Sequence, residues 1–240
     1  MKDQYFGDVN DFRKYGLLLR LSGGGVLCTG VCWMLTPPDG RTDGSALGYL
    51  SQPGEFRHLA PNLFDMLHGA VLIDKDRRVA RLEGASLLPN ALFYSPYVPD
   101  DREGRIAYFR DAAVKLGPAD WVFFDPDNGI EVPSKSVGRK GSSKFLYWHE
   151  VLATYQAGQS ALIYQHFPRR DRGPYIEGLA QALRERTGAR TVVSFRTSRV
   201  VFLLVSQDRH EEHFRAQAAG VTQGWGGQIV VAEHRHSTVS

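Results

Sequence analysis

The chain of 240 residues carries 29 Lys and Arg against 26 Asp and Glu, which leaves a formal net charge of only +3. This balance excludes a protein that binds nucleic acid over its whole surface, so any such site must be a local patch. Hydrophobic residues make up 42% of the chain, enough for a substantial core. We expect one domain over residues 1–240, because the sequence shows no repeat, low-complexity segment or convincing linker.

Two cysteines, Cys28 and Cys32, stand alone in the chain. They are too few for a disulfide framework or a complete structural zinc site, and we expect buried apolar residues in a reducing compartment. The chain opens without a signal-peptide pattern, and its apolar runs are shorter than the ~18 residues of a membrane span. These features predict a cytoplasmic protein with no membrane partner.

The first half of the chain predicts alternating helices and strands. Asn10 or Asp11 can cap a helix over residues 11–21, and the glycines of residues 22–25 end it. An apolar run then predicts a buried strand over residues 30–35. Further elements are expected as a loop at 41–60, helices at 61–67, 74–81 and 102–116, and strands at 71–73 and 92–94.

The second half begins with a strand over residues 121–124 and ends in a β-hairpin. The β-rich runs at 191–195 and 200–205 are separated by a short polar segment, which predicts an antiparallel pair. Residues 133–144 carry Lys and Arg among serines and glycines, and predict a mobile basic loop. The other elements are expected as strands at 160–164 and 228–232 and as helices at 145–155, 175–186 and 210–219.

The order of these elements indicates the fold class. Strands that alternate with helices imply a parallel sheet with right-handed crossovers, and the hairpin adds a reversed strand near one edge. The sequence therefore predicts an α/β fold: a Rossmann-like, mostly parallel sheet with helices on both faces and a C-terminal antiparallel β-hairpin.

Ten residues join the end of a predicted buried strand to a run of acids, an amide and a glycine. They read Phe123-Phe124-Asp125-Pro126-Asp127-Asn128-Gly129-Ile130-Glu131-Val132. Ligands bind at the carboxyl ends of the strands in open α/β sheets, where such side chains point. This stretch is the strongest candidate site, although Asp-Pro and Asn-Gly are also ordinary turn dipeptides.

The whole plan resembles the Rossmann-like fold of S-adenosylmethionine (SAM)-dependent methyltransferases, whose mostly parallel sheet ends in a hairpin that inserts one reversed strand. In the amino-methylating branch, the fourth strand ends in Asp/Asn/Ser-Pro-Pro-aromatic. Asp125 and Pro126 stand at the matching place, while Asp127 and Asn128 replace the second proline and the aromatic residue.

The N-terminal residues carry a second resemblance. Residues 6–15 are similar to the opening of the 23S ribosomal RNA adenine-N6 methyltransferase family, in which a Lys-His pair lies near the cofactor. Lys14 and Tyr15 occupy the place of that pair, so the histidine is replaced. A second departure lies at residues 36–40, Thr-Pro-Pro-Asp-Gly, where the superfamily has a glycine-rich cofactor loop. Prolines lack the N–H donors and the freedom that such a loop uses.

The resemblance implies an enzyme that binds SAM and methylates an amine of a nucleic-acid base, of the adenine N6 type. Asp125 and the Pro126 carbonyl would accept the N–H bonds of that amine and localise its lone pair. The catalytic candidates are Asp125, Pro126, Asp127, Asn128 and His166. The cofactor-binding candidates are Asp8, Lys14, Tyr15 and Thr36. Candidates that would stack on a base or hold phosphates are Tyr97, Lys135, Arg139, Lys140, Arg169 and Arg170.

Two other functions remain open from the residues. Asp125, Asp127 and Glu131 are hard oxygen ligands suited to Mg²⁺, so a magnesium-dependent nuclease or phosphoesterase is one alternative, with His166 as general base. A methyltransferase-like module that binds nucleic acid or protein without catalysis is the other. Four further histidines are expected at the solvated surface rather than in a metal site: His210, His213, His234 and His236.

Overall fold

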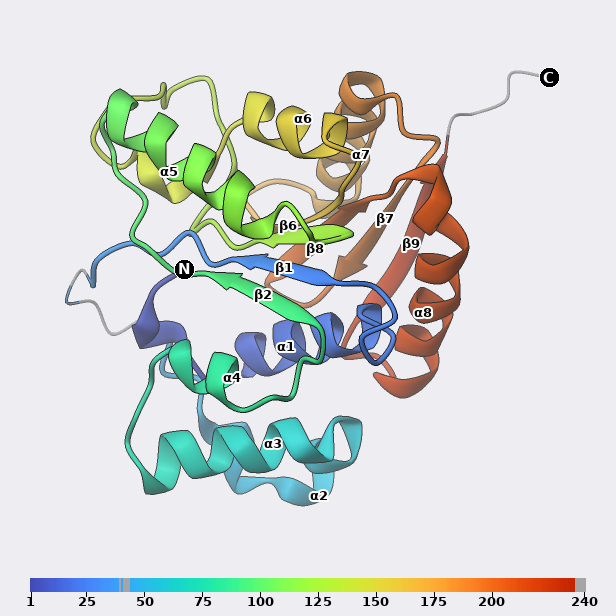
Figure 1. The fold of residues 1–240 in the computed structure, drawn as a ribbon. Helices are drawn as coiled ribbons and strands as arrows, with labels where there is room; N and C mark the ends of the chain where they lie inside the picture. Colours follow the sequence, from blue (N-terminus) through green and yellow to red (C-terminus); the bar gives the residue numbers. More distant parts are fainter. Residues whose placement is uncertain (39, 41–43, 236–240) are drawn as a thin grey trace.

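Seven strands form one mixed sheet in the computed structural model, which describes residues 1–38, 40 and 44–235 (Figure 1). Their order across the sheet is β2-β1-β3-β6-β8-β7-β9. The bounds are β1 Thr29–Cys32, β2 Ala91–Tyr94, β3 Trp121–Phe124, β6 Ser160–His166, β7 Thr191–Arg196, β8 Val200–Val205 and β9 Val230–Arg235. Two very short strands, β4 (Gly129–Ile130) and β5 (Phe145–Leu146), pair separately.

Helices cover both faces of the sheet (Figure 1). Helices α5, α6 and α7 lie on one face, and α1 and α8 lie on the other together with the shorter α2, α3 and α4. The bounds are α1 Val9–Leu21, α2 Pro53–Phe56, α3 Pro61–His68, α4 Ala80–Gly84, α5 Arg102–Leu116, α6 Trp148–Gln156, α7 Arg172–Thr187 and α8 Glu211–Gly224. The predicted α/β class is therefore confirmed.

Strand directions divide the sheet into two halves. β2, β1, β3 and β6 are parallel to one another, whereas β8 is antiparallel to both β6 and β7, and β7 is antiparallel to β9. The predicted pairing of the last two β-rich runs as a hairpin is confirmed by the register of β7 against β8. The sheet as a whole is mixed rather than mostly parallel.

Several elements differ from the sequence prediction. The apolar run at 71–73 is not a strand but part of a π-helical turn, Gly69–Ile73, that continues α3. Val71 packs over Gly7 there, so tertiary packing overrides the local β preference. β3 is consequently the third strand along the chain, not the fourth. The segment 74–81 becomes helical only at α4, the expected loop at 41–60 contains α2, and the predicted helix at 145–155 begins at Trp148.

β3 lies at the centre of the core because both of its faces are covered. Trp121 and Phe123 pack into the cluster on the α1 side, and Val122 and Phe124 pack into the cluster on the α5 side. This alternation follows from the two-residue period of a strand. The polar residues from Asp125 onward thus begin at the point where a fully buried strand ends.

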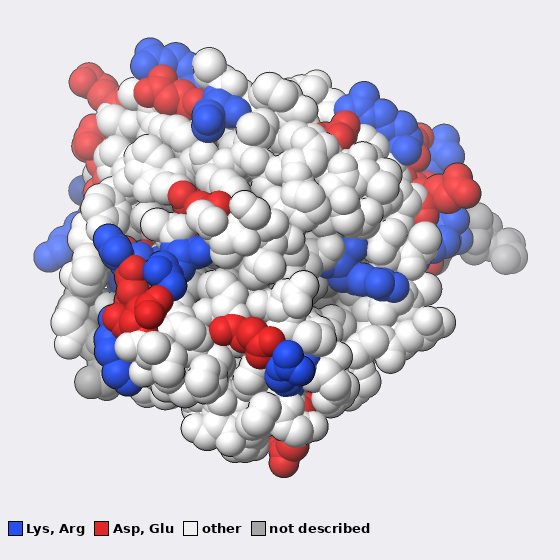
Figure 2. All heavy atoms as spheres, turned by 60° about the horizontal axis from the view of Figure 1, so that its bottom comes forward, with Lys and Arg blue, Asp and Glu red and all other residues white. Residues whose placement is uncertain are grey.

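Charged side chains of both signs are mixed on the face that carries α2 and α3. Figure 2 shows Lys and Arg interspersed there with Asp and Glu among many uncharged residues. Such a mixed face does not attract a polyanion, because opposite charges cancel over a short distance. A local basic patch must therefore be sought elsewhere on the molecule.

The contact between α1 and α8 gives a stability test. A Cβ atom added to Gly16 would lie 2.0 Å from Trp225 Cζ2, so Gly16→Ala should lower the free energy of unfolding by about 1–3 kcal/mol. Gly178 is an exposed residue of α7 with no atom near its Cβ position. Gly178→Ala should therefore raise that free energy by about 0.5–1 kcal/mol. Urea unfolding of both variants measures the difference, and equal effects would contradict the packing described.

Candidate functional site

A cavity of about 560 Å³ lies at the carboxyl ends of β3 and β6, against the first turns of α1. We call it the Asp125 cavity. Its walls come from four parts of the chain: the N-terminal segment with α1, residues 44–46, the segment after β3, and the β6 end with the β7–β8 turn. The polar side chains among its lining residues are Tyr5, Asp8, Asn10, Asp11, Lys14, Ser45, Asp125, Asp127, Tyr164, His166 and Arg199.

Asp8 fixes where α1 begins. Its carboxylate accepts hydrogen bonds of 2.8 Å from the backbone N–H groups of Asn10 and Asp11, which is the N-cap arrangement. The helix then places Asp11 and Lys14 on one face, since side chains three residues apart are neighbours. Asp8 is thus both the cap of α1 and part of the cavity wall.

Lys14 joins α1 to the end of β3. Its Nζ atom lies 2.6 Å from Asp11 Oδ1 and 2.7 Å from Asp125 Oδ2, and all three side chains are almost fully buried. The rings of Tyr15 and Tyr164 lie 5.5 and 5.6 Å from the same ammonium group, close enough for cation–π attraction. The cluster therefore combines ion pairs with aromatic walls that exclude water.

Burial dominates the electrostatics of this cluster. It raises the pKa of both Asp11 and Asp125 above the usual carboxyl value, and the neighbouring ammonium of Lys14 offsets only part of the effect. Burial alone would lower the pKa of Lys14, but its two carboxylate partners outweigh burial and raise that pKa. Two buried carboxylates thus share one lysine, and the cluster is short of positive charge.

Asp127 links the end of β3 to the segment after β1. Thr36 Oγ1 donates to Asp127 Oδ2 at 2.7 Å, and the N-terminal ammonium of Met1 lies 2.8 Å from Asp127 Oδ1. Burial alone would raise the pKa of Asp127, but the ammonium of Met1 and the Thr36 hydroxyl lower it. The pKa of Asp127 is therefore shifted downward, whereas that of its neighbour Asp125 is shifted upward.

Residues 1–2 fill the crevice between the ends of β1 and β3. The Met1 ammonium donates to the Asp125 carbonyl at 2.8 Å and to the Met34 carbonyl at 3.2 Å, and Thr36 N–H donates to the Met1 carbonyl. Figure 1 shows the N-terminus at the edge of the sheet toward which β1 and β2 point. Thr36 thus packs against the N-terminus, Pro37 and Pro38 are exposed, and Asp39 lies outside the described residues.

Gln165 holds the Asn-Gly turn against β6. Its Oε1 accepts a 2.8 Å hydrogen bond from Ile130 N–H, and its Nε2 donates to the Asn128 carbonyl at 3.2 Å. Gly129 has a φ of 108°, and a Cβ there would lie 2.3 Å from Gln165 Oε1, so only glycine fits. The turn is therefore specified by a partner residue that the sequence analysis did not identify.

The structure brings six predicted site residues together and separates the others. Those that line the Asp125 cavity are Asp8, Lys14, Asp125, Pro126, Asp127 and His166. Those outside its lining are Tyr15, Thr36, Tyr97, Asn128, Lys135, Arg139, Lys140, Arg169 and Arg170, of which the last two line a neighbouring hollow. Tyr15 is buried, and its hydroxyl donates to Asp11. The Thr36 hydroxyl donates to Asp127, and Asn128 is exposed. Tyr164 and Arg199 join the cavity without having been predicted.

The basic loop at 133–144 is tied down away from the cavity. The carboxylate of Asp100 accepts hydrogen bonds from the backbone N–H groups of Gly141 and Ser143, and Lys135 Nζ donates to the Lys140 carbonyl. These contacts hold the loop beside the N-terminus of α5. The three predicted phosphate-binding residues of this loop are therefore not available to a ligand in the Asp125 cavity.

A basic hollow adjoins the Asp125 cavity. It is formed by the segment from His166 to Arg172 and by the β7–β8 turn, and it shares His166 and Arg199 with the cavity. Its four arginines are Arg169, Arg170, Arg172 and Arg199, and we call it the arginine hollow. Asp171 is the acid among its lining residues, and that carboxylate accepts from Gly173 N–H as the cap of α7. The hollow therefore carries a strong positive excess.

The set of ligands expected for magnesium is not assembled. Glu131 Oε1 accepts a hydrogen bond from Trp148 N–H at the start of α6. Unlike Asp125 and Asp127, Glu131 does not line the Asp125 cavity. In the part of the chain that the structure describes, no three His, Cys, Asp or Glu side chains are grouped to hold a metal.

The prediction of a solvated His210 is wrong, because His210 is buried and its Nδ1 lies 2.9 Å from Ser160 Oγ. His236 lies outside the described residues.

Comparison with known proteins gives no indication of function. No protein-family model, no curated protein and no solved structure matches the chain. None of the helices in the described residues combines the length and apolar character that a bilayer crossing requires. The Asp125 cavity and the arginine hollow are thus the observations on which a function has to rest.

The shared lysine gives a test of the cluster. Lys14→Met should lower the free energy of unfolding by about 3–5 kcal/mol near neutral pH, because it leaves the carboxylates of Asp11 and Asp125 buried without their ion-pair partner. Burial already raises the pKa of both carboxyls, so they take up protons as the pH falls. The cost should therefore shrink at low pH.

Urea unfolding at pH 8 and at pH 5 measures this cost. Lys115→Met on the exposed last turn of α5 is the matched control, and it should change the free energy of unfolding by less than about 0.5 kcal/mol at either pH. A Lys14→Met cost that is the same at both pH values would show that the two carboxylates do not govern it.

Proposed function

We propose that this chain is a SAM-dependent methyltransferase-like protein that methylates an amine of a nucleic-acid base. The observation that carries the proposal is the position of Asp125 and Pro126 in a large polar cavity at the carboxyl end of a central strand. An exocyclic amine is a weak nucleophile because its lone pair is delocalised into the ring. A site for this chemistry needs hydrogen-bond acceptors fixed on a rigid element, and β3 supplies them.

The strand order supports the same proposal. In the methyltransferase fold a parallel sheet is followed by a hairpin whose second strand inserts, reversed, beside the last parallel strand. Here β8 lies between β6 and β7 and is antiparallel to both. The Asp125 cavity lies at the edge of the sheet where ligands of Rossmann-like proteins bind.

SAM fits the Asp125 cavity in size and charge. The volume of about 560 Å³ is within the range of small-molecule sites. The lining holds four carboxylates, and its side-chain cations are Lys14, Arg199 and, when protonated, His166. SAM carries a sulfonium and an ammonium group, and the Asp8 carboxylate in the lining is suited to face a positive charge. Because residues 1–2 fill the crevice beside β1, we place SAM against α1 rather than at a glycine-rich turn.

The residues of the chain would act on the amine. SAM supplies a methyl group on its sulfonium; as that group forms a bond to nitrogen, S-adenosylhomocysteine is released. Asp125 would accept an N–H of the amine and take the proton that nitrogen loses, for which its raised pKa is suited. Lys14 would hold the Asp125 carboxylate in place through their 2.7 Å ion pair. Tyr164, at the cavity wall, offers an aromatic face to a base.

The arginine hollow supports a nucleic-acid substrate. Its guanidinium groups have the geometry that binds phosphates in two hydrogen bonds. Arg199 and His166 border both spaces, so a strand whose phosphates lie in the hollow can extend one base into the Asp125 cavity. In this proposal the β7–β8 turn, and not the loop at 133–144, contacts the phosphates.

Cofactor binding and methyl transfer are the direct tests. Calorimetric titration with SAM should show binding in a one-to-one ratio, and transfer of a labelled methyl group to single-stranded RNA or DNA should follow. Asp125→Asn should reduce methyl transfer by about 100-fold or more, because the amide no longer accepts the proton. Asp111→Asn on the exposed side of α5 is the control and should leave transfer unchanged.

Two outcomes would contradict the proposal in different ways. If SAM produces no heat at millimolar concentration, the chain is not a SAM-dependent enzyme. If nucleic acid still binds under that condition, the chain acts as a non-catalytic binding module, which is one of the functions left open by the sequence. Equal methyl transfer by the wild type and Asp125→Asn would remove Asp125 from the reaction.

The salt dependence of nucleic-acid binding tests the arginine hollow. Arg199→Gln should weaken binding and reduce the slope of log affinity against log salt concentration by about 1. Arg110→Gln, on exposed α5, is the control and should leave the slope unchanged. Fluorescence anisotropy with labelled single-stranded RNA and DNA measures both slopes. An unchanged slope for Arg199→Gln would exclude the hollow as the phosphate contact.

A further inference from the structure

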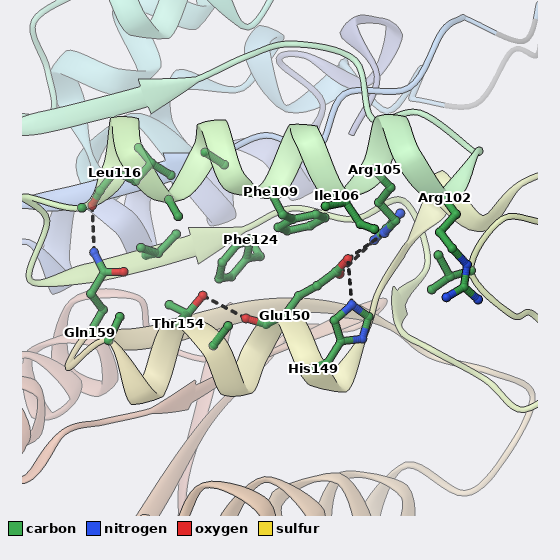
Figure 3. A pocket seen from close by; sticks show the side chains of 17 residues that line it. Arg102, Arg105, Ile106, Phe109, Leu116, Phe124, His149, Glu150, Thr154 and Gln159 are labelled. Carbon is green, nitrogen blue, oxygen red and sulfur yellow. Dashed lines mark hydrogen bonds and ion pairs between the residues drawn. The ribbon is translucent and has the colours of Figure 1, made fainter.

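A second cavity, of about 320 Å³, lies between α5 and α6 on the other side of β3 (Figure 3). We call it the α5–α6 cavity. Val122 and Phe124 of β3 form its floor, while the Lys14–Asp125 ion pair lies on the α1 side of the same strand. The cavity is therefore separate from the proposed methyltransferase site.

The lining of the α5–α6 cavity extends along most of α5. Arg105 and Leu116, both in its lining, are separated along α5 by about 16 Å at the rise of an α-helix. An elongated space between two helices suits a linear chain that lies along them.

The walls along this length are apolar. Aliphatic and aromatic side chains from both helices and from β3 line it: Ile106, Phe109, Ala112, Ala113, Leu116, Val122, Phe124, Ala153 and Ala157. Ile106 is 64% exposed, so apolar surface remains uncovered at the rim. Thr154, the hydroxyl residue of the lining, already donates its hydrogen to the Glu150 carbonyl. The middle of the cavity thus favours hydrocarbon.

The two ends of the cavity differ in polarity. At the Leu116 end, the Gln159 amide nitrogen donates to the carbonyls of Leu116 and Ala119, so its hydrogens are already used. At the other end, Arg105 and Glu150 form a buried pair with N–O distances of 2.6 and 2.9 Å, which neutralises both. Figure 3 shows these polar groups at opposite ends of the space between the helices.

Positive charge remains at the Arg105 end. Arg102 and His149 are both exposed lining residues there, and Figure 3 shows their side chains at the same end as the neutral pair. Among the described residues no carboxylate forms an ion pair with Arg102. His149 lies 3.8 Å from Glu150, whose carboxylate is already bound by Arg105. An anionic group would therefore find a cation at the mouth of an apolar channel.

We propose that the α5–α6 cavity binds a medium-chain aliphatic carboxylate. The carboxylate group lies at Arg102 and His149, and the hydrocarbon chain runs along α5 toward Leu116. The elongated lining along α5 suits a linear chain, the apolar walls stabilise it, and the charge at one end fixes its direction. This binding is independent of methyl transfer, because it uses the opposite face of β3.

Decanoate and decanol are the probes for this site. Calorimetric titration should show one decanoate bound per chain. Ala153 is an exposed residue of α6 that lines the cavity, so Ala153→Leu adds a larger side chain there and should abolish this binding. Ala216→Leu, at an exposed position of α8 outside the cavity, is the control and should leave binding unchanged. Arg102→Gln should weaken decanoate binding about tenfold and leave decanol binding unchanged.

Each part of the proposal can be overturned separately. Absence of saturable decanoate binding at millimolar concentration, or binding that survives in Ala153→Leu, would exclude the cavity as the site. Equal weakening of both probes by Arg102→Gln would exclude a carboxylate contact at the mouth. Circular dichroism of each variant confirms that the helices are intact, so that a loss of binding is not a loss of folding.

Discussion

The ion pairs of Lys14 are the constraint on which the candidate site depends. The lysine binds Asp11 within its own helix and Asp125 at the end of β3, 111 residues further along the chain. Removing three charges from water is costly, and the attraction repays that cost only when the geometry is tight. α1 therefore has to sit directly against the end of β3, and this contact forms one wall of the Asp125 cavity.

The position of α1 is in turn fixed by its cap and by the segment before it. Asp8 binds the first free N–H groups of the helix, and Gly7, with φ of 79°, makes the close approach to Val71 that the preceding turn requires. Asp127 and Thr36 then join the ends of β3 and β1. The result is an acid-rich cavity in which two neighbouring carboxyl groups have pKa values shifted in opposite directions: burial raises the pKa of Asp125, while the Met1 ammonium and the Thr36 hydroxyl lower that of Asp127.

β3 separates two environments of opposite chemistry. Phe123 faces the cluster on the α1 side, and Phe124 faces the α5–α6 cavity, only one residue before Asp125. A strand that is buried on both faces cannot shift its register without moving polar groups into the core. The polar cavity and the apolar channel are therefore held in a fixed relation by the same four residues, although their proposed ligands differ.

The sequence alone determined several local elements and placed the acidic run at the end of a buried strand. The apolar run before Asp125 predicted β3 with its observed bounds, and the helical spacing predicted α5, because both signals lie within a few residues. Partners distant in sequence were decided only by tertiary structure. The segment at 71–73, predicted as a strand, forms a helical turn in which Val71 packs over Gly7. Glu131 binds Trp148 N–H at the start of α6 and does not lie beside Asp125 in the cavity. Lys14 reached Asp125, and Arg199 reached the cavity, because strand pairing and burial bring together residues whose spacing along the chain carries no signal.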